Sequence, residues 1–85
     1  MQKVGSVVSV SLSFDSKTRK SFPRSVVWNG KLYAISRIGL HHTYRKGRVL
    51  YHVFSVVAST LFLRLVLNTE NLQWNLEEVQ DRLIS

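Results

Sequence analysis

The sequence contains no cysteine, one proline and four glycines in 85 residues. Without cysteine it can form neither a disulfide framework nor a thiolate metal site. Its most apolar run, Val53 to Leu67, contains Ser55, Ser59 and Arg64, and is too short and too polar to cross a bilayer. The first residues also lack the apolar segment of a signal peptide. We therefore expect a cytoplasmic protein that does not enter a membrane.

Acidic residues are scarce until the last part of the chain. Up to Thr69 there are eleven Lys and Arg residues and one acid, Asp15, whereas from Glu70 onward there are four acids and one cation, Arg82. The two parts carry formal charges of +10 and −3, within a total of +7. This asymmetry favours a face that attracts polyanions, although a small protein also needs net charge simply to remain soluble.

The motifs of common catalytic mechanisms are missing as well. Glu77 and Glu78 are adjacent rather than paired across a site, and no glycine-rich phosphate loop occurs. The serines alternate along predicted strands instead of lying at a strand-to-helix elbow. His41 and His52 could face each other, but the further ligands that a metal ion requires are not near them in the sequence. The sequence thus predicts a binding protein with no catalytic residue, metal site or cofactor.

The sequence does contain period-two alternation, which predicts β-strands. In the first strand, which would begin near Val4, apolar residues alternate with serines. The apolar positions are Val8, Val10, Leu12 and Phe14. The polar stretch from Asp15 to Ser21 then predicts an exposed loop.

Asn29-Gly30 predicts a tight hairpin, because these residues accept the two positive φ angles of a type I′ turn. A two-residue turn there pairs Trp28 with Lys31. One extra residue near Ser36-Arg37, a β-bulge, would bring Ile38 into phase with the preceding core positions and bend the strand.

A long hairpin from Ile38 to Val57 is predicted around Lys46-Gly47. A two-residue turn there pairs Arg45 with Arg48 and His41 with His52. The expected core face consists of Ile38, Leu40, Tyr44, Val49, Tyr51, Val53 and Val57. The expected polar face consists of Arg37, His41, Thr43, Arg45, Arg48, His52 and Phe54. His42 falls in the core row, where we expect a hydrogen-bonded, buried or rim histidine.

Two further turns continue the sheet: a three-residue loop at Ala58-Ser59-Thr60 and a four-residue turn from Asn68 to Asn71. Residues 77–85 fit either an extended strand or a short C-terminal helix capped by Asn75. Residues 1–85 are therefore expected to form one all-β domain, a small six-stranded barrel or strongly curled antiparallel sheet, mostly a meander. The expected core is Val10, Leu12, Trp28, Tyr33, Ile35, Leu40, Tyr51, Val53, Leu63, Leu65, Trp74 and Leu76.

The pattern Trp28-x-Gly30-Lys31-x-Tyr33-x-Ile35-x-x-Ile38 resembles the opening of an uncharacterised family of small bacterial domains. Those domains begin W-x-G-[KR]-x-Y-x-V-x-x-V and end in W-x-L, which Trp74-x-Leu76 matches. The resemblance covers about residues 24–79. It departs from the family at Ala58-Ser59-Thr60, where a glycine turn is expected. It implies a small β-domain and attaches no activity to it.

The polar face of the central hairpin is the expected binding site. Arginine grips phosphates with two hydrogen bonds, and imidazole or aromatic rings stack on unpaired bases. The residues of this site are Arg37, His41, Thr43, Arg45, Lys46, Arg48 and His52. They predict binding of nucleic acid, single-stranded rather than duplex, or of another polyanion. The alternatives are a solvated face without a ligand, and a protein partner or homodimer through an exposed patch of Phe54, Phe62 and Val66.

Overall fold

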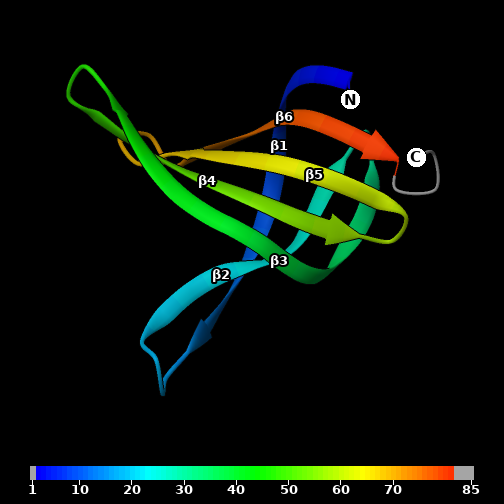
Figure 1. The fold of residues 1–85 in the computed structure, drawn as a ribbon, viewed down its shortest axis with the longest axis horizontal. Helices are drawn as coiled ribbons and strands as arrows, with labels where there is room; N and C mark the ends of the chain where they lie inside the picture. Colours follow the sequence, from blue (N-terminus) through cyan, green and yellow to red (C-terminus); the bar gives the residue numbers. More distant parts are fainter. Residues whose placement is uncertain (1, 82–85) are drawn as a thin grey trace.

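The computed structural model describes residues 2–81, which form six antiparallel strands and no helix. The strands are β1 (Gln2–Asp15), β2 (Lys20–Trp28), β3 (Lys31–Lys46), β4 (Val49–Ala58), β5 (Leu61–Asn68) and β6 (Gln73–Asp81). They pair in chain order, and β6 returns to β1 to close a barrel (Figure 1). The predicted all-β barrel is confirmed. The chain stays extended to Asp81 rather than forming a helix after Asn75, and residues 82–85 lie outside the described part.

Two long strands each take part in both halves of the barrel. β1 pairs with β6 as far as Val8 and with β2 from Ser9 onward. β3 pairs with β2 as far as Ala34 and with β4 from Ile35 onward. Irregularities in the β3 register lie between Ile35 and Arg37 and again between Ile38 and Leu40, so the predicted bulge is confirmed. Such bulges bend a strand and increase its twist, which lets one strand serve two halves of a barrel.

The Asn29-Gly30 turn forms as predicted. Both residues have positive φ, 52° and 74°, and Trp28 pairs with Lys31. The register of the next hairpin differs from the prediction. Its turn is Gly47-Arg48 and Lys46 pairs with Val49, so residues of β3 near the turn pair two positions further along the chain than predicted. Gly47 has φ 62°, as a type II′ turn requires at its first central position. The prediction placed this glycine at the second position and was therefore wrong about the register.

The β4–β5 turn is one residue shorter than predicted. Ala58 belongs to β4 and pairs with Leu61, so the turn is Ser59-Thr60, with Ser59 at φ 57°. Because side chains alternate across a strand, a change of one residue inverts its faces. Phe54 and Val56 therefore point into the barrel. From His41 to Val57, the residues predicted to share a face do share one. The face predicted to be buried in the barrel is however the outer face, and the predicted polar face is the inner one.

The core lies between the inward faces of all six strands. It consists of Val8, Val26, Phe54, Val56, Ala58, Leu63, Leu65, Trp74, Leu76 and Val79. Four expected core residues are confirmed as buried in it, and Val10, Trp28, Tyr33 and Ile35 pack partly buried against it. Leu12 and Leu40 are 51% and 57% exposed, so their assignment to the core was wrong. Leu12 continues β1 beyond the closed barrel, and Leu40 follows the second bulge of β3. Val53 is fully buried, as expected, although its side chain lies on the outer face of the sheet; Tyr51 lies on the same face and is half-buried.

Candidate nucleic-acid interface

The predicted binding residues all lie on β3, on β4 or in their turn, but they fall into three groups. Arg45, Lys46 and Arg48 are exposed at the end of the hairpin and form what we call the second basic tip. His41, Thr43 and His52 lie nearer the barrel. Arg37 lies eight positions before Arg45 on β3, about 26 Å along an extended strand. The seven residues therefore do not form one contiguous surface.

The two histidines extend the aromatic part of the core outward. The rings of Trp74 and Phe54 lie 5.7 Å apart in the barrel, and the ring of His41 lies 4.1 Å from that of Phe54, at 3° between planes. His52 lies beside His41, with its ring centre 5.1 Å from that of His41 and 6.4 Å from that of Phe54. We call these four rings the ring stack. The buried barrel core thus supports a series of rings that ends at the surface.

A hydrogen bond joins the two histidines. His41 Nε2 lies 2.8 Å from His52 Nδ1, so one nitrogen donates a proton and the other accepts it. They were predicted as direct cross-strand neighbours, but His41 pairs with Phe54 and His52 pairs with Thr43. Their rings meet diagonally across the ladder, which long side chains on adjacent strands allow.

The same surroundings disfavour a charge on His41. One face of its ring is covered by Phe54, and this loss of hydration is the main cause that lowers its pKa from 6.5. Repulsion from His52, His42 and Lys20 lowers the pKa further. Lys20 belongs to β2, so the first hairpin approaches the ring stack closely enough to influence its charge.

That first hairpin carries a second group of cations. Lys17, Arg19 and Lys20 form what we call the first basic tip. Figure 1 shows the two tips on the same side of the view but pointing apart, the second tip at the upper left and the first at the lower left. Asp15 organises this turn, because its carboxylate accepts from the Lys17 amide at 2.9 Å and its carbonyl from the Arg19 amide at 2.7 Å. The cations could be seen in the sequence, but not their proximity to His41, which depends on how the two hairpins pack.

Exposed apolar groups lie between the first tip and the barrel. Leu12 and Phe14 continue the inward face of Val8 and Val10, yet Phe14 is 64% exposed because the hairpin extends past the closed part of the barrel. A basic tip and exposed apolar side chains thus occur together on the first hairpin.

One acid lies near the second tip. The amide and hydroxyl of Thr69 both donate to the carbonyl of Leu50, at 3.1 and 2.7 Å, and fasten the β5–β6 turn to β4. Glu70 is the next residue and is exposed. The tip therefore has an acidic neighbour that the sequence, where Glu70 is 22 positions after Arg48, did not suggest.

The outer face of the hairpin has a different character. Tyr44 and Tyr51 stack there, 4.9 Å apart, beside the ion pair of Arg64 and Glu77. Burial, and then the charge of Glu77, raise the pKa of Tyr44. His42 shares this face and is exposed, so of the two expected positions, buried or at the rim, the buried one is excluded. The second bulge and the shorter turn place the tyrosines outside, where His42 has no covering layer.

The expected partner patch is also corrected. Phe54 is only 7% exposed inside the barrel, and Val66 is buried beside Val53 on the outer face. Phe62 alone of the three is exposed. The inverted faces of β4 explain the difference, since Phe54 and Phe62 point to opposite sides of the sheet.

Comparisons with known proteins found no match. Protein-family models, curated proteins and solved structures were each searched, with the same result. The family resemblance drawn from the sequence therefore stays a prediction. Among residues 2–81, no group of three or more His, Asp or Glu side chains is placed to hold a metal ion. The same residues include no helix of the length and apolarity needed to span a membrane.

Proposed function

We propose that this protein binds single-stranded nucleic acid across the ring stack, between the two basic tips. The observation that carries the proposal is the outward series of rings from Phe54 to His41 and His52, with cations on the hairpins to either side. Rings on a rigid support are platforms for unpaired bases, and flanking Lys and Arg hold the phosphates. Such a protein would act as a binding module in the cytoplasm and not as an enzyme.

The support beneath the rings matters for affinity. His41 lies flat on Phe54, and Phe54 packs against Trp74, so the imidazole is already oriented before a base arrives. The hydrogen bond to His52 restricts the ring further. A preorganised platform loses less entropy on binding than a free side chain would. A base would therefore stack on the exposed ring of His41, beside the half-buried His52, without rearranging the barrel.

A single strand suits this site better than a duplex. In a duplex the base faces are already stacked on one another, so rings can engage them only after unpairing. Duplex recognition would instead need an element that enters a groove. Phosphate contacts dominate at the tips, which predicts strong salt dependence and little sequence preference.

The test is a fluorescence-anisotropy titration of labelled single- and double-stranded oligonucleotides at two salt concentrations. With micromolar protein at about 50 mM salt, binding of the single strand should be measurable, and it should weaken steeply as salt rises. No binding under these conditions overturns the proposal. Equal affinity for DNA, RNA and heparin would show that the protein attracts polyanions in general and has no site for nucleic acid.

Two variants with matched controls separate the tips from the rings. Arg45→Gln with Arg48→Gln should lower the slope of log affinity against log salt by about 1.4, whereas Lys3→Gln with Lys31→Gln removes equal charge elsewhere and should change it little. His41→Ala with His52→Ala should weaken binding by about 1–3 kcal/mol while leaving the slope unchanged. Equal effects of the two charge variants would show that no particular surface binds.

The alternative function is a protein-interaction module, and the edge of β3 favours it. From Ile35 onward β3 pairs with β4 alone, so in the described residues its other edge has no neighbouring strand. An extended segment of another protein could add to this edge by main-chain hydrogen bonds. Antiparallel addition of a second copy would bring Arg37 near Arg45 or Lys46, so charge repulsion favours an acidic partner over a homodimer. Sedimentation that shows only monomers at high and low salt would exclude the homodimer.

A further inference from the structure

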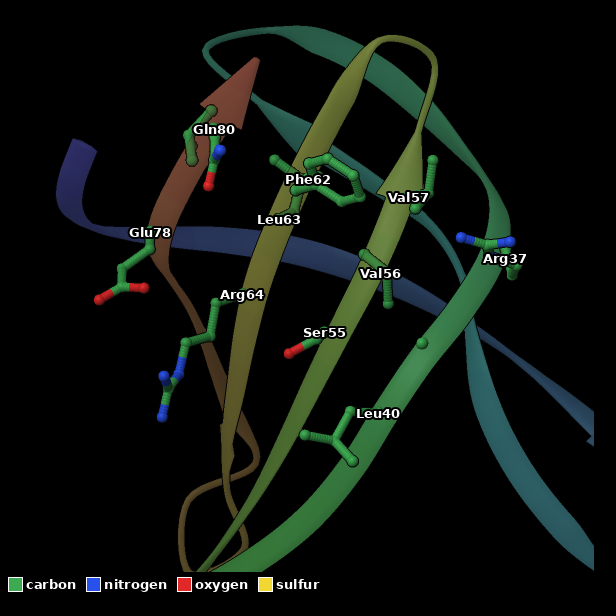
Figure 2. A pocket seen from close by; sticks show the side chains of 12 residues that line it. Arg37, Leu40, Ser55, Val56, Val57, Phe62, Leu63, Arg64, Glu78 and Gln80 are labelled. Carbon is green, nitrogen blue, oxygen red and sulfur yellow. The ribbon is translucent and has the colours of Figure 1, made fainter. Parts of the chain in front are cut away.

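A pocket of about 480 Å³ lies on the outer face of β3 to β6, on the opposite side of the sheet from the ring stack (Figure 2). Its apolar wall is formed by Leu40, Val57 and Phe62, with Ser55 between Leu40 and Arg64. Sites for small molecules commonly measure about 300–1,000 Å³ and are mostly apolar with a few polar groups. The size and lining of this pocket fall within that description.

Small residues keep the pocket open. Gly39 does not have positive φ, and a Cβ there would meet only the Ser55 carbonyl oxygen, at 3.5 Å. Its backbone therefore does not require glycine. Ser55 is likewise small, and it lies between larger neighbours on β3 and β5. Leucine at either position would fill space that these residues leave free.

The charges at the two sides of the pocket differ. Arg64 and Glu77 form an ion pair at 3.3 Å, and Arg64 pairs across the strands with Glu78, so two acids outnumber one cation on the β6 side. On the β3 side, Figure 2 shows the guanidinium of Arg37 at the edge of the pocket beside Val57. Arg37 forms no ion pair with any residue from 2 to 81. An uncompensated cation thus borders an apolar surface.

We propose that this pocket binds a small amphipathic carboxylate, with its apolar body over Val57 and Phe62 and its carboxylate on Arg37. The planar guanidinium matches a carboxylate with two parallel hydrogen bonds. Leu40 and Phe62 are 57% and 41% exposed, so a ligand that covers them removes apolar surface from water. The proposal is independent of nucleic-acid binding, because the pocket and the ring stack lie on opposite faces.

The test uses decanoate, below the concentration at which it forms micelles, in a calorimetric titration. Decanol and decyltrimethylammonium serve as uncharged and cationic probes of the same chain length. Decanoate should bind about fivefold or more tightly than decanol, because a hydrogen-bonded charge pair adds to the same apolar contact, and the cationic probe should bind most weakly. Equal affinity for all three overturns the role of Arg37, and no decanoate binding overturns the site.

Variants locate the site. Ser55→Leu should abolish decanoate binding, whereas Ser55→Thr should retain most of it. Arg37→Gln should reduce the affinity for decanoate to that for decanol, whereas Lys31→Gln removes an equal charge beside the Asn29-Gly30 turn, away from the pocket, and should have little effect. Amide shifts in a nuclear magnetic resonance titration should centre on Gly39, Ser55 and Phe62. Shifts centred on His41 and His52 contradict the proposal. It is also contradicted if the protein is a dimer that the Ser55→Leu substitution dissociates and that does not bind decanoate.

Discussion

The imidazole of His41 lies parallel to the phenyl ring of Phe54, with 4.1 Å between ring centres and 3° between planes. Phe54 is buried, whereas His41 is exposed on its other side. One contact therefore connects the packing of the core to the surface proposed to bind bases. Changes to either ring should affect both stability and binding, and the two effects can be measured separately.

Stability should decrease as pH falls below about 6.5, the ordinary pKa of histidine. The pKa of His41 is lower in the folded protein, mainly because Phe54 covers the ring and also because His52, His42 and Lys20 repel a charge. Between the folded and unfolded pKa values the unfolded chain thus binds more protons, so falling pH favours unfolding. Urea denaturation at several pH values should show this decrease, and it should be smaller in His41→Phe. An unchanged slope in that variant would contradict the assignment to His41.

Nucleic-acid binding should show the opposite dependence on pH. A polyanion favours a protonated imidazole, so affinity for single strands should rise as pH falls through the titration of His41. Because the pKa of His41 is lowered, the rise should continue below pH 6.5. Anisotropy titrations at constant ionic strength measure it. Persistence of the full effect in His41→Phe with His52→Phe would exclude these residues as its source.

Phe54→Ala should lower the free energy of unfolding by about 3–5 kcal/mol, the usual loss when a buried phenylalanine is truncated. Phe62→Ala should lower it much less, because Phe62 lies on the outer face of β5 and is 41% exposed. Chemical denaturation of both variants tests the orientation of β4 and β5 directly. A larger loss for Phe62→Ala would mean that the faces are assigned the wrong way round.

Gly47→Ala should be destabilising by about 1–2 kcal/mol, since an L-residue resists the left-handed backbone region. Gly47 has φ 62° at the turn between β3 and β4. Gly39→Ala is the matched control, because Gly39 has no positive φ and its new Cβ would make only an ordinary contact. Thermal unfolding of the two variants should separate them, and equal melting temperatures would argue against the type II′ turn.

Glu70→Gln should strengthen binding of single strands by a few-fold at low salt, because it removes the acid next to the turn fastened to Leu50. Glu78→Gln makes the same change of charge on the outer face, far along β6 from this turn, and should have a smaller effect. The difference between the variants should diminish as salt rises. If both variants bind equally tightly, only net charge matters.

The fold class, and the features that depend on neighbouring residues, could be predicted from the order of the amino acids. Asn29-Gly30 specifies a turn whose two φ angles few other residues accept, and its pairing was predicted correctly. The bulge near Arg37 followed from a change of phase in the alternation. The cations of the second basic tip were also visible, because they adjoin a turn, where side chains are exposed.

Only the tertiary structure decided which face of β4 is inside. Both of its rows are apolar enough to be core, so the decision depended on the length of the Ser59-Thr60 turn, and one residue inverted the result. The approach of Lys20 to His41 depends on contacts between strands distant in sequence. Alternation reports only that two faces differ. Closure of the barrel determines which of them is buried, because it brings Phe54 against Trp74 and leaves Tyr44 and Tyr51 outside.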